Sequence, residues 1–316
     1  NLCDYLMKKF GDELELICFD NDIEKINQLG KSCIIYEDLR SLKYMTQKRK
    51  DLFFKDTDIV FHLAGNVSIY DCDKNRYDAF ENNVLGSIQL LDLCVEYNVK
   101  KIIYAETSAM YENDTPPHNE YVIKPRTIYA VTKTCLHYIV KSYNELYGIQ
   151  YTGLRYFNVY GKNQDYTRTV PPLFIGVGLR MKNNKGAVVF GDENRRRDFI
   201  HVDDINSFHE ICISDKRTDN QVYNLGTGES TSIIEIIDII SKIMNKEELV
   251  KETIYLNEIN GEAFDIYADI NKALSLGWSP KVRLVEGIID MLSDLEKIEV
   301  ENFMEDVIKN VNKIKI

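Results

Sequence analysis

The sequence lacks the features that mark membrane proteins and nucleic-acid-binding proteins. No apolar run approaches the ~18 residues that a membrane span needs, and no secretory signal peptide opens the chain. Acidic residues outnumber basic ones by 50 to 39, which gives a formal net charge of −11. Such a balance argues against nucleic acid or an anionic membrane surface as the main partner. We therefore expect neither of them as a partner.

Cysteine, glycine and proline are sparse or unevenly placed. The seven cysteines are odd in number, scattered and without a Cys-x-x-Cys pair, which excludes a disulfide framework or a zinc site and predicts free thiols in the cytoplasm. Of the sixteen glycines, only Gly11 and Gly30 lie within the first 64 residues. All six prolines lie at position 116 or beyond. With 44% hydrophobic residues, the chain can nevertheless bury a sizeable core.

The first half of the chain alternates short apolar runs with helical patterns. The apolar runs predict strands at 14–19, 33–36, 59–63, 101–104 and 151–156, and the helical spacing predicts helices at 22–29, 40–50, 78–97 and 129–147. This alternation predicts an α/β fold with a doubly wound parallel sheet. Residues 1–10 have the pattern of a helix that Gly11 ends. The chain thus opens with a helix, where such a fold should open with a strand.

The second half is less regular. Its patterns predict helices at 173–182, 204–214, 232–245, 284–296 and 301–313, and short strands at 188–190, 197–200, 222–225 and 264–268. They indicate a smaller α+β domain packed against the α/β domain. We place the α/β cofactor domain at residues 1–160 plus about 197–226, and the smaller domain at about 161–196 plus 227–316.

A tyrosine and a lysine stand one helical turn apart at the start of a predicted helix, in Tyr129-Ala-Val-Thr-Lys133. A phenolate base at neutral pH needs a pKa about three units below ~10, roughly 4 kcal/mol of differential stabilisation. An adjacent ammonium and a bound cationic nicotinamide could supply this lowering. The same spacing recurs at Tyr5, Tyr44, Tyr70 and Tyr97. The spacing alone therefore does not distinguish Tyr129 from the other four tyrosines, and its position in the chain has to do so.

The position is set by a hydroxyl cluster, Tyr104-Ala-Glu-Thr-Ser-Ala-Met-Tyr111, which ends a predicted strand 22 residues before Tyr129. Parallel sheets place their ligand sites at the carboxyl ends of the strands. Thr107 and Ser108 are candidates for catalysis there, although turn or cap roles are open to the same residues.

These motifs resemble the extended short-chain dehydrogenases/reductases, in particular the NAD-dependent nucleotide-sugar epimerase/dehydratase family and, within it, the UDP-hexose 4-epimerases. The resemblance covers roughly residues 1–290. The matching segments, in family order, are Phe19-Asp-Asn21, Glu37-Asp-Leu39, His62-Leu-Ala-Gly65, Asn82-Asn-Val-Leu-Gly86, Thr107-Ser-Ala-Met-Tyr111, Tyr129 to Lys133, Leu154-Arg-Tyr-Phe-Asn-Val-Tyr-Gly161, Arg197-Asp-Phe-Ile-His-Val-Asp-Asp204 and Asn224-Leu-Gly226.

The resemblance implies roles at the cofactor. It makes Tyr129 the acid/base and Lys133 its ribose-binding, pKa-lowering partner. Asp20 resembles the acid that binds the adenosine ribose, and a carboxylate there repels a 2′-phosphate, which favours NAD over NADP. We interpret His62 as a core histidine. The other implied cofactor contacts are Asn21, Asp38, Leu39, Ala64, Gly65, Asn83 and Tyr156.

The resemblance also implies substrate contacts. Thr107, or Ser108 if the alignment slips by one residue, corresponds to the hydroxyl that hydrogen-bonds the reacting sugar hydroxyl. Arg197 begins a strand where the family holds a nucleotide diphosphate, and arginine suits bidentate pairing with phosphate. We expect Arg195 and Arg196 to lie in a solvated loop. The remaining implied contacts are Asn158, Glu262 and Phe190, for which a simple core role is equally open.

Three positions depart from the family pattern. Ala109 stands two residues after Thr107, where related dehydratases and decarboxylases carry an acid. Elimination needs that acid and 4-epimerisation does not, so Ala109 favours an epimerase. Ile259 replaces an arginine that aids the diphosphate, which leaves the nucleotide open. Glu112 replaces a glycine, so the local turn should differ.

The largest departure is at the front of the chain. Aligning Gly11 and Asp20 places Asn1 directly after the last glycine of the family's GxxGxxG fingerprint, so we expect the first strand and the phosphate-binding turn to be missing. The sequence is then either a fragment or a truncated protein, and a sheet without its central first strand would leave backbone groups unpaired.

We therefore predict an NAD-dependent UDP-hexose 4-epimerase, in which Tyr129 removes the 4-hydroxyl proton on the way to a 4-keto sugar. One alternative is another nucleotide-sugar epimerase or reductase of the same family. Another is a non-catalytic, truncated chain that serves as a partner subunit. The resemblance further implies a homodimer formed through the helices at 78–97 and 129–147.

Overall fold

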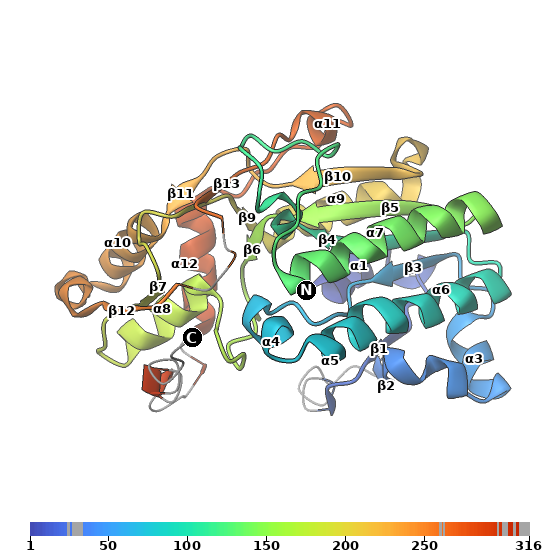
Figure 1. Ribbon diagram of the computed structural model, residues 1–316, viewed down its shortest axis with the longest axis horizontal. Coiled ribbons are helices and arrows are strands. Elements are labelled where there is room, and N and C mark those ends of the chain that lie inside the picture. The colour runs from blue at the N-terminus through green and yellow to red at the C-terminus, as the bar shows by residue number, and fades with distance from the viewer. Residues whose placement is uncertain are drawn as a thin grey trace.

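The computed structural model describes residues 1–23, 26, 34–258, 261, 263–295, 297–298, 303–305 and 308–309. Most of the helices predicted at 22–29 and 301–313 lies outside these residues, as do Cys33, Ile259 and Glu262. The elements form two groups that lie side by side in Figure 1. One group is built on a parallel sheet with helices on both faces, and the other consists of short strands and helices.

Four parallel strands form the main sheet, in the order β10 (Gln221–Leu225), β5 (Gln150–Tyr156), β4 (Lys101–Thr107) and β3 (Ile59–His62). A second parallel sheet contains β1 (Cys18–Asp20) and β2 (Ile34–Tyr36). The predicted α/β fold with parallel strands is therefore confirmed. Among the described residues no strand joins β1 to β3, so the two sheets are separate.

Alternation of side chains along β4 explains why helices cover both faces of the main sheet. Ile102 and Tyr104 belong to a core cluster that includes residues of α6 (Ser87–Glu96) and α7 (Ile128–Tyr147). Ile103, which lies between them, belongs to a cluster with residues of α9 (Val202–Ser214). Figure 1 shows α6 and α7 on the near side of the strands and α9 on the far side.

The predicted opening helix is α1 (Leu2–Phe10), and it ends at Gly11 as expected. Gly11 has φ +52°, a backbone conformation that glycine adopts without a steric penalty. Two contacts fix α1 against α9: the Tyr5 hydroxyl donates to Glu210 at 2.6 Å, and Lys9 pairs with Glu210 at 3.0 Å. The helix is thereby held on the far face of the main sheet.

Two predicted helices are wrong as continuous elements. The pattern at 40–50 is a 3₁₀ helix, Leu39–Tyr44, followed by α3 (Gln47–Phe54), because extended backbone at Met45 and Thr46 separates them. The pattern at 78–97 is divided into α5 (Arg76–Phe80), a π-helical turn at Glu81–Gly86, and α6. The preceding α4 (Ile69–Lys74) was not predicted, since six residues are too few to show a helical period.

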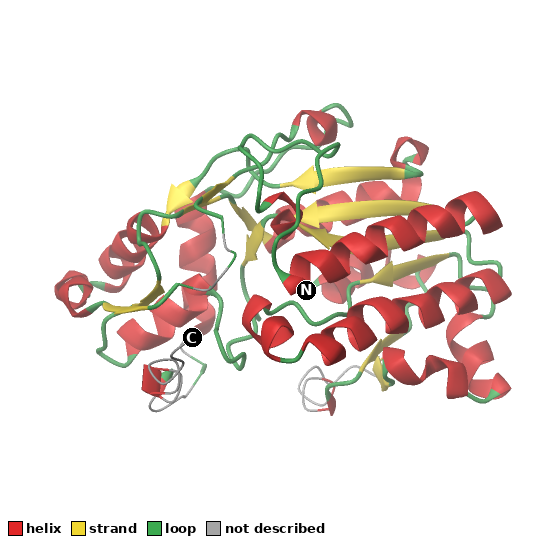
Figure 2. Ribbon diagram, viewed as in Figure 1, coloured by secondary structure: helices red, strands yellow, loops and turns green. Residues whose placement is uncertain are grey.

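The smaller group of elements has its own core. β7 (Val188–Phe190) pairs in parallel with β12 (Ile254–Leu256), which the sequence did not reveal. α8 (Leu173–Lys182), α10 (Ile233–Met244) and α12 (Leu284–Leu295) contribute buried apolar residues to one cluster. A capping box between Ser232 and Glu235 sets the start of α10. Figure 2 shows these helices gathered at one end of the molecule.

Short strands connect the two groups. The strand predicted at 197–200 is in fact β8 (Arg196–Arg197) and β9 (Phe199–His201), which pair with different partners. β9 pairs with β6 (Asn158–Tyr160), and β8 lies between β11 (Thr231–Ser232) and β13 (Asp265–Ile266). The break falls at Asp198, whose buried carboxylate accepts hydrogen bonds from the N–H groups of Thr227, Gly228 and Ala268 at 2.7, 3.0 and 3.1 Å. The predicted domain boundaries stay a prediction.

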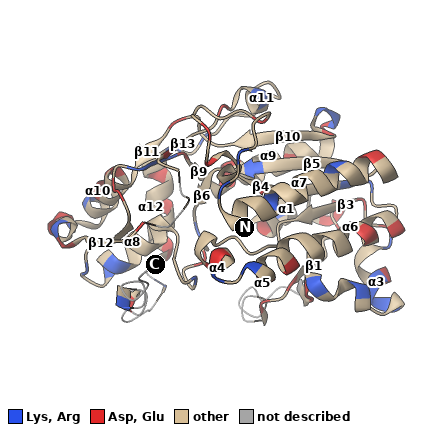
Figure 3. Cartoon of the chain, in the orientation of Figure 1, with Lys and Arg blue, Asp and Glu red and all other residues tan. Residues whose placement is uncertain are grey.

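The outer surface mixes charges of both signs. Figure 3 shows basic and acidic residues interspersed along the helices, and surface ion pairs such as Lys50 with Glu96 at 3.1 Å join some of them. None of the described helices combines the length and hydrophobicity that crossing a bilayer requires. None of the six described cysteines is in a disulfide.

Candidate active site

A cleft of about 360 Å³ opens where the carboxyl ends of β4 and β5 face α8 and β8 of the smaller group. Parallel sheets place their ligand sites at this edge. The cleft brings together six of the residues predicted from the sequence, which are Thr107, Ser108, Tyr129, Tyr156, Asn158 and Arg197.

The first turn of α7 carries Tyr129 to the cleft. Thr127 begins this turn because its hydroxyl accepts a hydrogen bond from the Ala130 N–H at 3.2 Å. The side chain of Tyr129 is buried and faces the cleft with part of its surface. One turn later, the buried Lys133 ammonium donates to the carbonyl oxygen of Ala105 at 3.1 Å. The helix thus fixes both members of the tyrosine–lysine pair.

Burial raises the pKa of Tyr129, the candidate base, to about 12, against a hydrogen bond with Thr107 and the charge of Arg168, which both lower it. Burial lowers the pKa of Lys133 to about 8, and the charge of Glu106 opposes this. The lowering of the Tyr129 pKa by Lys133 together with a bound nicotinamide stays a prediction. A further positive charge close to the phenol is needed for it to ionise near neutral pH.

Thr107 ends β4 and begins the 3₁₀ turn Ser108–Tyr111. Its hydroxyl oxygen accepts a hydrogen bond from the Ala109 N–H at 3.2 Å and also interacts with Tyr129. Ser108 lines the cleft beside it. Thr107 is therefore the cap residue and also contacts the phenol, and its catalytic role stays a prediction.

Three predicted cofactor residues lie at the carboxyl ends of β1 and β2, outside the cleft-lining set. The Asp20 carboxylate accepts from the Asp22 N–H at 2.9 Å, which turns the chain after β1. Asn21 donates to Asp38 at 3.2 Å. Asp38 also binds Arg40 at 2.6 Å, which lowers the pKa of Asp38 to about 2 and keeps it ionised. This edge is therefore acidic.

Gly65 and Asn83, which the sequence predicts as cofactor contacts, lie close to Lys133. A Cβ added to Gly65 would lie 3.4 Å from the Lys133 Nζ and 3.0 Å from the Asn83 Oδ1. Asn83 is buried and held by the backbone of Asn66, with distances of 2.6 Å to the N–H and 2.9 Å to the carbonyl oxygen. The missing side chain at Gly65 leaves room beside the lysine. Ala64 precedes this glycine, and Leu39 is buried beside α6 in the core.

On the opposite side of the cleft, Arg197 donates to the carbonyl oxygens of Arg196 and Phe264 at 2.9 and 3.1 Å. Asn158 donates to the Asp198 carbonyl oxygen at 3.3 Å. The Tyr156 hydroxyl lies 2.8 Å from His209 of α9, so its polar end is directed away from the cleft.

Phe190 is not among the cleft-lining residues and packs against the core cluster of Val188 and Leu256, which favours the core role that the sequence left open. Glu262 lies outside the described residues, as does Ile259.

The prediction that Arg195 and Arg196 lie in a solvated loop is wrong. Arg195 is buried and pairs with Glu258, and Arg196 of β8 donates to Ser230 at 3.1 Å and to Glu235 at 3.2 Å. Both side chains hold neighbouring segments together. His62 is a core residue as predicted, buried with its Nε2 2.8 Å from the Ser87 hydroxyl.

Sequence reasoning missed two charged residues of the cleft. Arg168 lines it from the loop before α8, where no spacing or strand end marks a functional position. Glu112 also lines it, and the sequence flagged this residue only as a replaced glycine. Its backbone φ of −53° is helical, so the turn forms without glycine. Its carboxylate accepts from the N–H groups of Arg126 and Thr127 at 2.8 and 2.7 Å and from the Thr127 hydroxyl at 2.9 Å.

The comparisons with known proteins agree with this geometry. The model of the NAD dependent epimerase/dehydratase family matches residues 1–226. The chain belongs to this family. The resemblance inferred from the sequence motifs is thereby confirmed, and the protein is an NAD-dependent enzyme.

Relatives within the family include nucleotide-sugar 4-epimerases. A putative UDP-glucose 4-epimerase of Methanocaldococcus jannaschii is 36% identical over 74% of this chain and 76% of its own length. A UDP-glucuronate 4-epimerase of Thermodesulfobacterium geofontis is 31% identical over 72% of this chain and 69% of its own length. The structure of the Thermotoga maritima UDP-glucose 4-epimerase with UDP-glucose is similar with a TM-score of 0.83, at 27% identity and 94% coverage of both chains.

The described residues fit NAD. An acidic edge after β1 suits the hydroxyls of an adenosine ribose. The space beside Gly65, bordered by the Lys133 ammonium and the Asn83 amide, suits a second ribose with its hydroxyl donors and acceptors. Both features lie along the carboxyl edge of the strands that leads to Tyr129.

Proposed function

We propose that this family member is a UDP-hexose 4-epimerase. The observation that carries the proposal is the pairing of Thr107 and Tyr129 in a cleft where the next potential acid–base position holds Ala109. Elimination reactions need an additional acid or base, whereas 4-epimerisation needs only the 4-hydroxyl proton to be moved. Epimerisation of nucleotide sugars is also the activity named for the relatives described above.

Glu112 does not substitute for the missing acid. Although it lines the cleft, its two carboxylate oxygens receive three hydrogen bonds from Arg126 and Thr127 at the start of α7. These three hydrogen bonds tie the carboxylate to the residues that begin α7. We therefore assign Glu112 to positioning α7.

In the proposed mechanism, Tyr129 removes the proton of the sugar 4-hydroxyl while the Thr107 hydroxyl orients it. When bound, NAD⁺ would supply reversible hydride acceptance at C4 and a positive charge. The 4-keto sugar would present its other face before the hydride is returned, and Tyr129 would give the proton back to the 4-oxygen. Lys133 would hold the cofactor ribose, and Asp20, Asn21 and Asp38 its adenosine end.

We assign the nucleotide diphosphate to the side of the cleft that holds Arg197 and Asn158. Arginine pairs well with phosphate oxygens, and both residues lie on the short strands between the two groups of elements. We keep as a proposal the two-domain division, with residues 1–160 plus about 197–226 for NAD and the remainder for the nucleotide sugar; Asn158 and Arg197 then lie at the border of the NAD domain. We further propose a cytoplasmic homodimer.

The decisive experiment incubates the protein and NAD⁺ with a panel of nucleotide sugars and separates the products by chromatography. The proposal expects interconversion of UDP-glucose and UDP-galactose, or of their N-acetyl forms. Dehydrated or 4-keto products in place of the epimer would refute it. No turnover by this chain would favour the alternative of a non-catalytic partner subunit.

A second candidate is 4-epimerisation of a UDP-uronic acid. Arg168 favours it, because this cation lines the cleft close enough to Tyr129 to affect its pKa. An arginine is suited to a sugar carboxylate. A UDP-glucuronate 4-epimerase is also among the relatives. Including UDP-glucuronic acid in the same panel distinguishes the two candidates.

A further inference from the structure

Glu106 lies in β4 between Ala105 and Thr107, and each of these neighbours contacts one member of the tyrosine–lysine pair. The residue before it, Ala105, accepts the hydrogen bond from Lys133 at 3.1 Å. The residue after it, Thr107, interacts through its hydroxyl with Tyr129. The end of β4 therefore contacts Lys133 through Ala105 and Tyr129 through Thr107, with Glu106 between them. Any shift of Glu106 would move both contacts.

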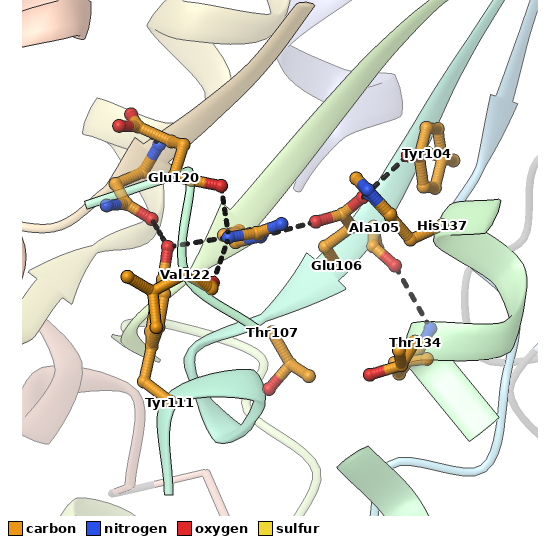
Figure 4. A network of polar contacts seen from close by, with 12 residues as sticks. Tyr104, Ala105, Glu106, Thr107, Tyr111, Glu120, Val122, Thr134 and His137 are labelled. Atoms are coloured by element: carbon orange, nitrogen blue, oxygen red, sulfur yellow. Dashed lines mark hydrogen bonds and ion pairs between the residues drawn. The ribbon is translucent and has the colours of Figure 1, made fainter. Parts of the chain in front are cut away.

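The Glu106 carboxylate is buried and is held by three polar side chains, which together we call the clamp. Arg155 of β5 donates to it at 2.6 Å, His137 of α7 lies at 2.7 Å, and the Tyr104 hydroxyl donates to it at 2.6 Å. Figure 4 shows Tyr104 and His137 beside Glu106 at the strand end. The neighbouring charge of Arg155 and these hydrogen bonds hold the pKa of Glu106 at about 2 in spite of its burial. The group is ionised at every physiological pH.

Arg155 extends the clamp to the loop that leads into α7. Its Nη1 donates to the Tyr111 hydroxyl at 2.8 Å and to the carbonyl oxygens of Glu120 and Val122 at 3.0 and 3.2 Å. Through this arginine, Glu106 is connected to two parts of the segment between Thr107 and Tyr129. A buried ion pair is weak evidence for stability, because desolvation offsets most of the attraction. A role in fixing one geometry is the better account of it.

The same carboxylate is the negative charge that acts on Lys133. The titratable groups that interact with Lys133 are Glu106 of β4, the Cys72 thiol of α4 and His62 of β3. Burial lowers the pKa of His62 to about 3 and raises that of Cys72 to about 11, so both are neutral near pH 7. Glu106 is thus the fixed anion among these groups.

We propose that Glu106 is a positioning residue for the epimerase reaction, which holds the end of β4 against α7 and places a buried negative charge opposite Lys133. This inference rests on the proposed roles of Tyr129 and Lys133. It predicts that the charge of Glu106, and not only its shape, is required, because without an anion the buried lysine would lose its proton near neutral pH.

The test compares Glu106→Gln, which keeps the shape and removes the charge, with Glu106→Asp, which keeps the charge. Glu120→Gln is the matched control, since this partly buried carboxylate adjoins the same network but accepts from the Asn224 N–H instead of contacting β4. Lysine labelled with ¹³C at Cε reports the pKa of Lys133 by NMR, with Lys133→Arg to assign its signal. The pH dependence of kcat/KM and the melting temperature are measured on the same samples.

We expect Glu106→Gln to lower the NMR-measured pKa of Lys133 by about one unit and to move the alkaline limb of kcat/KM by the same amount. Glu106→Asp should restore most of both values, and Glu120→Gln should leave them unchanged. An unchanged Lys133 pKa in Glu106→Gln, with a loss of activity that follows the melting temperature, would overturn the proposal. If Glu106→Gln does not fold, the wild type alone tests the proposal. Its Lys133 should titrate near pH 8. A pKa below about 6, which burial without a neighbouring anion gives, would refute the role of Glu106.

The NMR measurement separates this inference from the proposed function. If the wild type converts no nucleotide sugar, the proposed function fails while the Lys133 titration still tests Glu106. If the wild type is active and Tyr129→Phe is not, but Glu106→Gln leaves the Lys133 pKa unchanged, only the role of Glu106 fails.

Discussion

The attachment of Glu112 to the start of α7 gives a prediction whose size follows from the structure. Replacing Glu112 with alanine removes three hydrogen bonds to one carboxylate, two of them from the backbone N–H groups of Arg126 and Thr127. Thr127 is buried, so its N–H would find no replacement in water. Hydrogen bonds to charged groups contribute roughly 1.5–3 kcal/mol each and are not additive, so we expect a loss of about 2–4 kcal/mol in the free energy of unfolding.

Two further variants sharpen this prediction. Glu112→Gln should cost only about 1 kcal/mol, because the amide oxygen can still accept from both N–H groups. Glu96→Ala, which breaks the surface pair with Lys50, should cost less than about 1 kcal/mol. Urea denaturation followed by circular dichroism measures all three. A loss below 1 kcal/mol for Glu112→Ala, or equal losses for the alanine and glutamine variants, would refute the capping argument.

The remaining predictions concern the cleft and its titration. Tyr129→Phe should lower turnover by about 10²–10⁴-fold with an unchanged melting temperature, and turnover within a few-fold of wild type would exclude this residue as the acid/base. Arg168→Gln should reduce turnover of UDP-glucuronic acid far more than that of UDP-glucose if the uronate is the substrate, and equal effects would exclude that candidate. Because burial lowers the pKa of Lys133 to about 8, kcat/KM should fall as the pH rises through this value and the ammonium is lost; a flat profile to pH 10 would contradict it. The pKa of Glu106 is depressed from 4.5 to about 2, so its ionised form contributes stability above about pH 4.5 that is lost as the pH falls toward 2. Thermal melting between pH 5 and 3 should therefore be less pH-dependent in Glu106→Gln than in wild type.

The fold could be predicted where elements are long and their periods are clear. The strands around β4 and the helix α7 follow apolar runs and helical spacing that local sequence alone determines. Short elements such as β6, β12 and α4 could not be predicted, because three to six residues give no clear period and the pairing of the two strands depends on distant segments. The break at Asp198 has the same origin, since the N–H groups that bind its carboxylate come from residues 227, 228 and 268.

The candidate site divides in the same way. Tyr129, Lys133 and Thr107 could be selected from the sequence because a strand end, a helix start and the family motifs coincide there. Glu106 directly precedes one of the family segments and Arg155 lies inside another, but their contact joins neighbouring strands, and no sequence spacing reports it. Arg195 was misjudged for this reason, because Glu258, which neutralises it, lies 63 residues away in the chain. The sequence thus marks the residues on the strand edge and leaves their supporting partners hidden.

The central claim is that the protein epimerises C4 of a UDP-hexose through a 4-keto intermediate, with the proton moved by Tyr129. The most direct measurement uses UDP-glucose labelled with deuterium at C4, incubated with the protein and NAD⁺ in ordinary water and analysed by NMR. The account predicts UDP-galactose that retains deuterium at C4, since the hydride that leaves is the one that returns. Product that has lost the deuterium to solvent would contradict the account.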